Sequence, residues 1–217
     1  IGGIVLLESA QPVGGYELRK NSEAARELVD QLYQKYGFYY DVIDNLQADK
    51  AIDEPVRKVA LQIANSRKRG EADKLNGESW DVVSSSDGEP NAYSQALSKS
   101  EKAVSLEPND LNILNTLGVA QYRVGDYENA LGALTRCEKS RADNHLEPAP
   151  ENVAFIAMSL HKLDRKNEAK AALERLRGLC KEERFAENQE AQAFLAEAEK
   201  LIRKGLEIRQ RVLGESH

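Results

Sequence analysis

Residues 111–140, LNILNTLGVAQYRVGDYENALGALTRCEKS, constrain the fold more than any other stretch of the chain. Apolar residues recur at helical spacing on both sides of Gly125 and Asp126, so the stretch predicts two amphipathic helices joined by a turn. Gly125 suits the left-handed backbone that ends a helix, and Asp126 can cap the next one. Gly118 and Ala130 are small residues at places where two helix backbones would approach closely. A pair this short cannot bury its apolar face alone, which predicts neighbours with the same pattern.

The same pattern occurs 34 residues earlier and 39 residues later in the chain. One position of the repeat holds a small residue each time: Ser84, Gly118 and Ala157. Another position holds alanine each time: Ala96, Ala130 and Ala169. Pro108 lies at the end of the first repeat, in the expected turn between repeats, where a residue that stops a helix belongs. The sequence therefore predicts three helix pairs of one kind, stacked side by side.

The repeat resembles the tetratricopeptide repeat, which has a Trp or large apolar residue, Leu-Gly, an aromatic, Ala and a closing Pro over 34 residues. Trp80 and Pro108 carry the resemblance in the first repeat, and Leu117, Gly118 and Tyr127 carry it in the second. The third repeat keeps its alanine and the apolar frame. The resemblance implies an all-α fold: a right-handed helical solenoid of such pairs, with an N-terminal helical subdomain and a C-terminal capping helix.

We expect four parts along the chain. An extended segment or linker at residues 1–20 precedes an N-terminal helical subdomain at 21–72, and three repeats lie within 73–183. The repeats are expected at 77–110, 111–144 and 150–183. A capping helix and tail follow at 184–217, with an apolar stripe that includes Phe194 and Ile202, because repeat arrays need a final helix to cover the core.

Three short helices are expected in the subdomain. Asn21 and Ser22 offer a cap for the first, Gly37 ends it, and the second lies near residues 40–48. The third begins at residues 53–55, where a proline suits the first turn. The basic run at residues 67–69 is expected to close this third helix, because cations favour the negative end of the helix dipole.

Two segments are expected to be irregular, and one to be extended. Residues 11–16, with a proline and a glycine pair, predict a linker or turn, and residues 84–90 predict a polar loop. The apolar residues 1–7 suit a strand or an extended docking segment. The chain does not begin with Met, so we expect a fragment of a longer protein or a processed product.

Composition and motifs exclude several kinds of function. The net charge of −6 and the lack of a concentrated basic face argue against nucleic acid as a partner. No apolar run has the length to span a bilayer, so we expect no membrane contact and a cytoplasmic location. The two cysteines predict neither disulfide nor zinc site, and Cys137 is expected in the core. Neither a P-loop nor HExxH occurs, and three histidines are scattered, so we expect no enzymatic activity, no metal and no cofactor.

Binding is the remaining route to function. The resemblance implies that the first helices line a concave groove, and it assigns these groove positions: Asn115, Val119, Tyr122, Arg123, Met158, His161 and Lys162. Three of them would form an exposed apolar floor, and three would form a positive rim. A partner peptide with an apolar anchor and an acidic neighbour would suit such a groove. The alternative, that several of these side chains contact the next repeat or the closing helix, stays open.

A second resemblance concerns the order of NGESWDVV, LNTLGVAQYRVGDYENAL and FIAMSLHKLDRKNEAKAALERL within residues 20–180. It is similar to C-terminal regions of large planctomycete-type bacterial proteins, many of which carry a serine/threonine kinase domain. The first interpretation is a protein-interaction scaffold. One alternative is a regulatory or substrate-recruiting region of a larger signalling kinase. Another is a structural subunit that assembles with itself through the ends of the array and residues 4–7.

Overall fold

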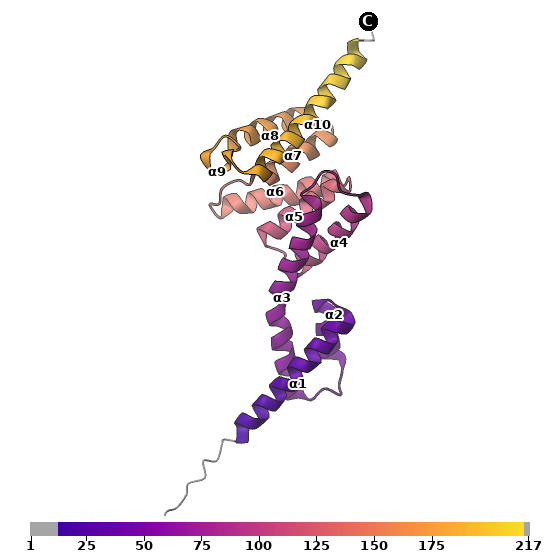
Figure 1. Cartoon of the computed structure of the whole chain (residues 1–217), viewed down its shortest axis with the longest axis vertical. Coiled ribbons are helices and arrows are strands. Elements are labelled where there is room, and N and C mark those ends of the chain that lie inside the picture. The colour runs from indigo at the N-terminus through magenta and orange to yellow at the C-terminus, as the bar shows by residue number, and fades with distance from the viewer. Residues whose placement is uncertain (1–12, 215–217) are drawn as a thin grey trace, which may run out of the picture. The chain divides into compact units, whose positions relative to one another are not determined.

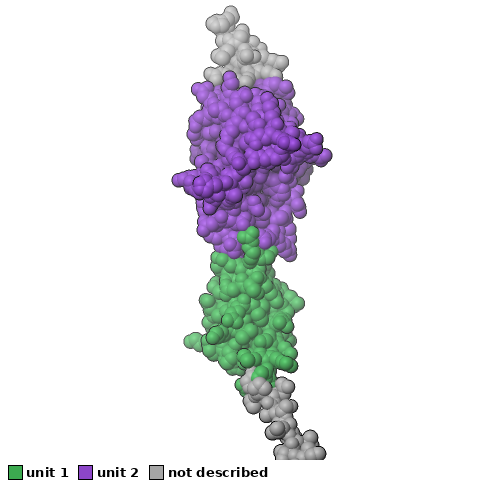
Figure 2. All heavy atoms as spheres, turned by 90° about the vertical axis from the view of Figure 1, so that its left-hand side faces the viewer, with its two compact units in different colours: residues 1–71 green, residues 72–217 purple. Residues whose placement is uncertain are grey.

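The computed structural model describes the backbone of residues 13–214 and the side chains of residues 15–204. Over these residues all regular secondary structure is helical (Figure 1). The segment 1–7, expected to be extended, lies outside the described residues. The chain divides into two compact units, Ile1–Glu71 and Ala72–His217 (Figure 2).

Unit 1 contains α1 (Val13–Tyr36), α2 (Tyr39–Ala48) and the first part of α3 (Glu54–Val83). Gly37 ends the first helix with φ of 72°, as expected, because glycine enters this region without steric cost. The starts of α2 and α3 also confirm the prediction. Small and branched residues from the three helices form the core of this unit: Ala25, Val29, Val42, Leu46, Ala60 and Ala64.

Helix α1 begins earlier than the sequence predicted. It starts at Val13, so the expected linker is wrong for residues 13–16, and the expected cap at Asn21 and Ser22 is wrong too. The Ser22 hydroxyl donates to the Leu18 carbonyl one turn earlier, at 2.8 Å, as serine does inside a helix. Residues 17–20 are good helix formers, and they carry the helix back past the polar pair.

The basic run does not close a helix, because α3 continues through it to Val83. Side chains of unit 1, and not the helix dipole, stabilise these basic groups. Arg67 pairs with Asp30 at 2.7 Å and lies over the Tyr33 ring. The Lys68 ammonium lies 5.8 Å from the centroid of the Tyr39 ring. The run is thus part of the packing of α3 against α1 and α2.

Unit 2 contains the rest of α3 and seven more helices within the described residues. They are α4 (Pro90–Leu106), α5 (Leu111–Arg123), α6 (Tyr127–Asp143), α7 (Pro150–Lys162), α8 (Lys166–Leu179), α9 (Glu183–Ala186) and α10 (Gln189–Gly214). Helices α4 to α8 each pack on the next one along the chain, and α10 packs on α7 and α8 (Figure 1). The loop expected at residues 84–90 is present, because α3 ends at Val83 and α4 begins at Pro90.

The expected close contact within the second pair is confirmed at Gly118. A Cβ atom there would lie 2.5 Å from Leu134 Cγ and 3.4 Å from the Ala130 carbonyl oxygen, so only glycine fits. The alanine that recurs in each repeat is buried on α4, α6 and α8, respectively, at Ala96, Ala130 and Ala169. Gly132, by contrast, faces open space.

Helix α10 covers the last pair, as expected of a closing helix. Phe194 and Ile202 are buried in the same apolar cluster as Leu173 and Leu176 of α8. Cys137 is fully buried, which confirms its place in the core. Among the described residues, no helix combines the length and the apolar character that crossing a membrane requires.

Candidate protein-binding site

The structure places most of the expected groove residues inside unit 2. Val119 and Met158 are fully buried, and Tyr122 and Asn115 are each 8% exposed. The prediction of an exposed apolar floor is therefore wrong. These positions lie on first helices, but other side chains cover them, which is the alternative that the sequence left open.

Arg123 lies where α3, α5 and α10 meet. Its side chain is 5% exposed, and both of its Nη atoms donate to the Glu197 carboxylate of α10, one of them at 3.0 Å. Its Nε donates to the Val83 carbonyl at 2.9 Å, at the C-terminal end of α3. Carbonyl groups in the last turn of a helix have no partner within the helix, so the guanidinium supplies a missing donor. Arg123 therefore joins three helices and is not a free cation on a rim.

Aromatic rings surround this ion pair. The Arg123 guanidinium lies 4.9 Å from the centroid of the Phe155 ring of α7. Phe155 meets Tyr122 and Phe194 edge-to-face, with both centroid distances at 5.2 Å. Phe194 also contacts Trp80 of α3, whose indole Nε1 donates to Glu190 of α10 at 3.1 Å. We call the surface formed by Trp80, Arg123 and Phe155 the first-helix wall; α10 occupies it.

The remaining groove residues differ in charge and exposure. His161 is half-buried, and burial, followed by the ammonium groups of Lys162 and Lys166, lowers the pKa of its imidazole. The lowered pKa disfavours the charged imidazole, so His161 contributes less positive charge to the expected rim than Lys162 does. Lys162 is exposed, and its Nζ lies 5.7 Å from the centroid of the Tyr127 ring.

Asn115 belongs to a buried polar network away from this wall. Its amide donates to the Asn152 side chain of α7, and Asn152 donates to the Glu138 carboxylate of α6 at 2.9 Å. Glu138 also accepts from the Ala149 backbone N–H at 3.1 Å and from Arg175 at 3.0 Å. Every member has a partner, so the network links four helices, α5 to α8, and serves their packing.

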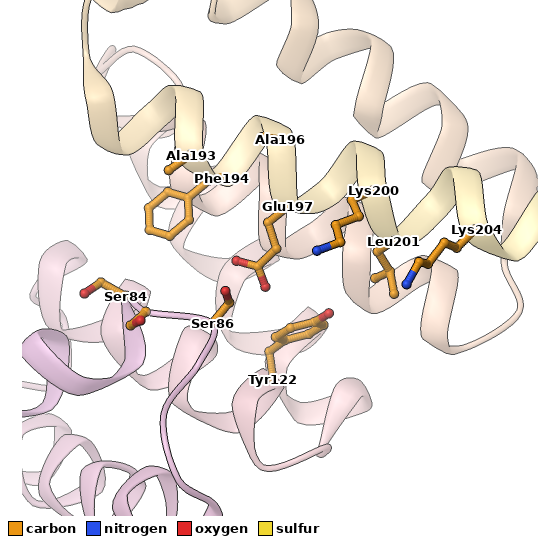
Figure 3. Close-up of a pocket in the computed structure, with 11 residues that line it drawn as sticks. Ser84, Ser86, Tyr122, Ala193, Phe194, Ala196, Glu197, Lys200, Leu201 and Lys204 are labelled. Carbon is orange, nitrogen blue, oxygen red and sulfur yellow. The ribbon is translucent and has the colours of Figure 1, made fainter.

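An open pocket of about 710 Å³ lies beside the wall, between α10, the end of α5 and the loop after α3 (Figure 3). We call it the Tyr122 pocket. Its lining is Ser84, Ser85, Ser86, Tyr122, Ala193, Phe194, Ala196, Glu197, Lys200, Leu201 and Lys204. Of the seven expected groove residues, only Tyr122 lines it. Burial and the nearby Glu197 raise the pKa of the Tyr122 phenol, so it stays a neutral hydroxyl.

The two lysines give this pocket its charge. Lys200 and Lys204 lie one helical turn apart, so both ammonium groups are on one face of α10, and both side chains are exposed. Figure 3 shows them on the same side of α10 as Glu197 and Leu201, across from Tyr122 and the serine loop. Because Arg123 neutralises Glu197, the pocket combines an apolar floor with a basic rim.

The serine loop holds a fixed backbone against this pocket. The Tyr93 hydroxyl donates to the Ser85 carbonyl at 2.9 Å and accepts from the Gly88 N–H at 2.8 Å. A Cβ atom at Gly88 would lie 2.7 Å from the Tyr93 ring, so the loop and the ring fit each other closely. The side chains of Ser85 and Ser86 remain exposed. The loop backbone therefore forms a fixed side of the pocket.

Metal chemistry finds no support in the described residues, where no three His, Cys, Asp or Glu side chains are grouped to hold an ion. The sequence interpretation missed Glu197, Lys200 and Lys204, because α10 was expected only to cover the core. The signal available was the charge on α10 beside its apolar stripe. Comparisons with protein-family models, curated proteins and solved structures found no match to this chain.

Proposed function

We propose that the chain is a cytoplasmic protein-interaction scaffold, a right-handed solenoid of tetratricopeptide-type helix pairs that binds a partner peptide. The adjacent packing of α4 to α8 and the buried alanine at one position of each pair support this architecture. The partner is an acidic segment with one large apolar side chain. It binds in the Tyr122 pocket, and not across the buried positions of α5 and α7.

One observation carries the proposal: the pocket pairs an apolar floor with two exposed lysines. Leu201 and the accessible edge of Tyr122 can contact an apolar side chain, while Lys200 and Lys204 can attract a neighbouring carboxylate. A deep apolar anchor supplies most of the affinity in interfaces of this kind, and complementary charge adds specificity and speed of association. The chain's net charge of −6 repels acidic ligands elsewhere, which confines their binding to this basic spot.

Selection of short random peptides on the full chain tests this proposal. We expect enrichment of acidic peptides that contain one Leu, Phe or Trp, with binding that weakens as salt rises. Charge reversal by Lys200→Glu with Lys204→Glu should abolish capture of the selected peptides. The matched control is Lys139→Glu with Lys170→Glu, which reverses two exposed lysines on α6 and α8. Peptides without acidic residues, or equal capture by both variants, would contradict the proposal.

A further inference from the structure

The first-helix wall carries a second inference, which does not depend on the Tyr122 pocket. We infer that this wall is a binding surface for an amphipathic helix with one aromatic anchor between two acidic residues, and that α10 is its ligand in cis. The partner in trans is a helix of the same chemistry from another protein. Docking of α10 hides the surface until such a helix displaces it.

The contacts of α10 define what the wall recognises. Phe194 is 2% exposed and inserts between Trp80 and Phe155, with ring centroids 6.0 Å and 5.2 Å away. Glu190, four residues earlier, accepts from the Trp80 indole. Glu197, three residues later, pairs with Arg123. The acidic residues are thus one turn on either side of the anchor, on the same face of the helix.

The wall carries hydrogen-bond donors, which a helix that only covers the core would not need. A purely apolar stripe would bury Phe155 and Trp80 equally well, whereas this wall presents a buried guanidinium and an indole N–H. The buried guanidinium demands an acceptor from whatever helix lies there, whereas the exposed indole N–H adds a weaker preference because water can replace its acceptor. A helix that lacks a carboxylate opposite Arg123 would leave a buried cation with one partner fewer. The surface therefore discriminates in favour of acidic helices.

The tether explains why α10 occupies the wall in the resting chain. Only residues 180–188 separate the end of α8 from the start of α10, so the local concentration of α10 at the wall is high. A helix in trans therefore competes only when its own affinity is high or when the docking of α10 is weakened. Weakening α10 should increase the apparent affinity for a free helix in proportion to the fraction of open chain.

Trp80 reports the state of this wall directly, because it is the single tryptophan of the chain. The experiment compares the full wild-type chain with the full Phe194→Ala, Glu197→Ala variant, in which α10 loses its anchor and its ion pair. The probe is a synthetic peptide of residues 188–204. We expect longer-wavelength Trp80 emission in the variant, return of the original emission on adding the peptide, and affinity at least about tenfold higher than for wild type.

Two controls separate recognition from simple loosening of α10. Glu199→Ala removes a carboxylate from the same helix, but its partner at 2.7 Å is Arg177 of α8, away from the wall. This variant should keep the wild-type emission and the weak peptide binding. The peptide with Phe194→Ala should fail to bind the opened chain, and adding Arg123→Ala to the opened chain should weaken binding of the unchanged peptide.

A second measurement keeps the inference testable if the double variant unfolds. A protease site placed within residues 181–188 of the otherwise unchanged chain frees α10 from its tether after cleavage. Excess labelled peptide should then exchange into the cleaved protein. A helical, cooperatively folded double variant that fails to bind the peptide, or a cleaved protein that never exchanges α10, would show that α10 is only a structural cover. Neither result bears on the peptides selected at Lys200 and Lys204.

Discussion

The first and second helix pairs of unit 2 follow one repeat pattern but close in different ways. The α5–α6 pair has a three-residue turn with φ of 91° at Gly125, and each helix has its own cap. The Asp110 carboxylate accepts from the N–H groups of Asn112 and Ile113. The pair formed by α3 and α4 has a six-residue loop instead, and Glu89 makes no capping hydrogen bond with its side chain.

The α3–α4 pair is completed by one distant residue, Arg123, and by side chains of the pair itself. Arg123 of α5 supplies the donor at the end of α3, and the Tyr93 hydroxyl holds the loop. Ser79 of α3 is fully buried and donates to the Ala96 carbonyl of α4 at 2.9 Å. The difference teaches that a helix pair can lack side-chain caps at its turn when a neighbouring helix and other side chains of the pair provide hydrogen bonds there. Four substitutions test this contrast, taken from the largest expected effect to the smallest.

Gly118→Leu should disrupt the locally specified pair most. The added side chain would overlap Leu134, so α5 and α6 would have to separate, at a cost of about 3 kcal/mol in the free energy of unfolding. Denaturant titration measures this loss. Gly132→Ala is the control, because its Cβ would face open space. A stability equal to wild type for Gly118→Leu would show that the repeat register is wrong.

Arg123→Ala should disrupt the pair that depends on a distant residue. The substitution leaves the Val83 carbonyl without its donor and Glu197, 23% exposed, without its partner. We expect a loss of about 2 kcal/mol, less than for a fully buried ion pair because water reaches Glu197. Trp80 emission should shift as α10 loosens. The comparison would fail if α5 and α6, measured by hydrogen exchange, opened more than the end of α3.

Asp110→Ala should cost about 1 kcal/mol, because it removes a capping carboxylate from two N–H groups of α5. Glu89→Ala provides the matched substitution at the start of α4, where no side-chain cap exists, and it should change stability little. Thermal unfolding of the two variants measures the difference. Equal losses would mean that the α4 cap resembles the α5 cap after all.

Gly88→Ala should have the smallest effect, about 0.5 to 1 kcal/mol, because the Tyr93 ring can move slightly to admit one methyl group. We expect hydrogen exchange to increase at residues 84–89 while α5 and α6 keep their protection, which would separate the α3–α4 turn from the α5–α6 pair. Tyr93→Phe, which removes the two hydrogen bonds of the hydroxyl, should increase exchange in the same loop. Unchanged exchange in both variants would show that Tyr93 does not hold the loop.

The sequence by itself determined the features that depend on neighbours within one helix pair. Gly118, Gly125 and the recurring alanine fixed the register of α5 and α6, because backbone conformation and close contact leave few residue choices. Asp126 marked the start of α6 for the same local reason. The polar pair before residue 23 suggested a helix start, but good helix formers before it extend α1 back to Val13. The basic run suggested a helix end near residue 69, but α3 continues to Val83.

Only the tertiary structure decided which face of the array is covered. Arg123 and Glu197 are 74 residues apart, so nothing in local sequence couples them. In the same way, the Tyr39 N–H at the start of α2 donates to the Glu71 carboxylate of α3 at 3.1 Å, a cap that comes from a distant residue. An exposed cation and a buried ion pair look identical in sequence. Burial of Arg123 followed from where α10 docks, and that depends on packing between distant segments.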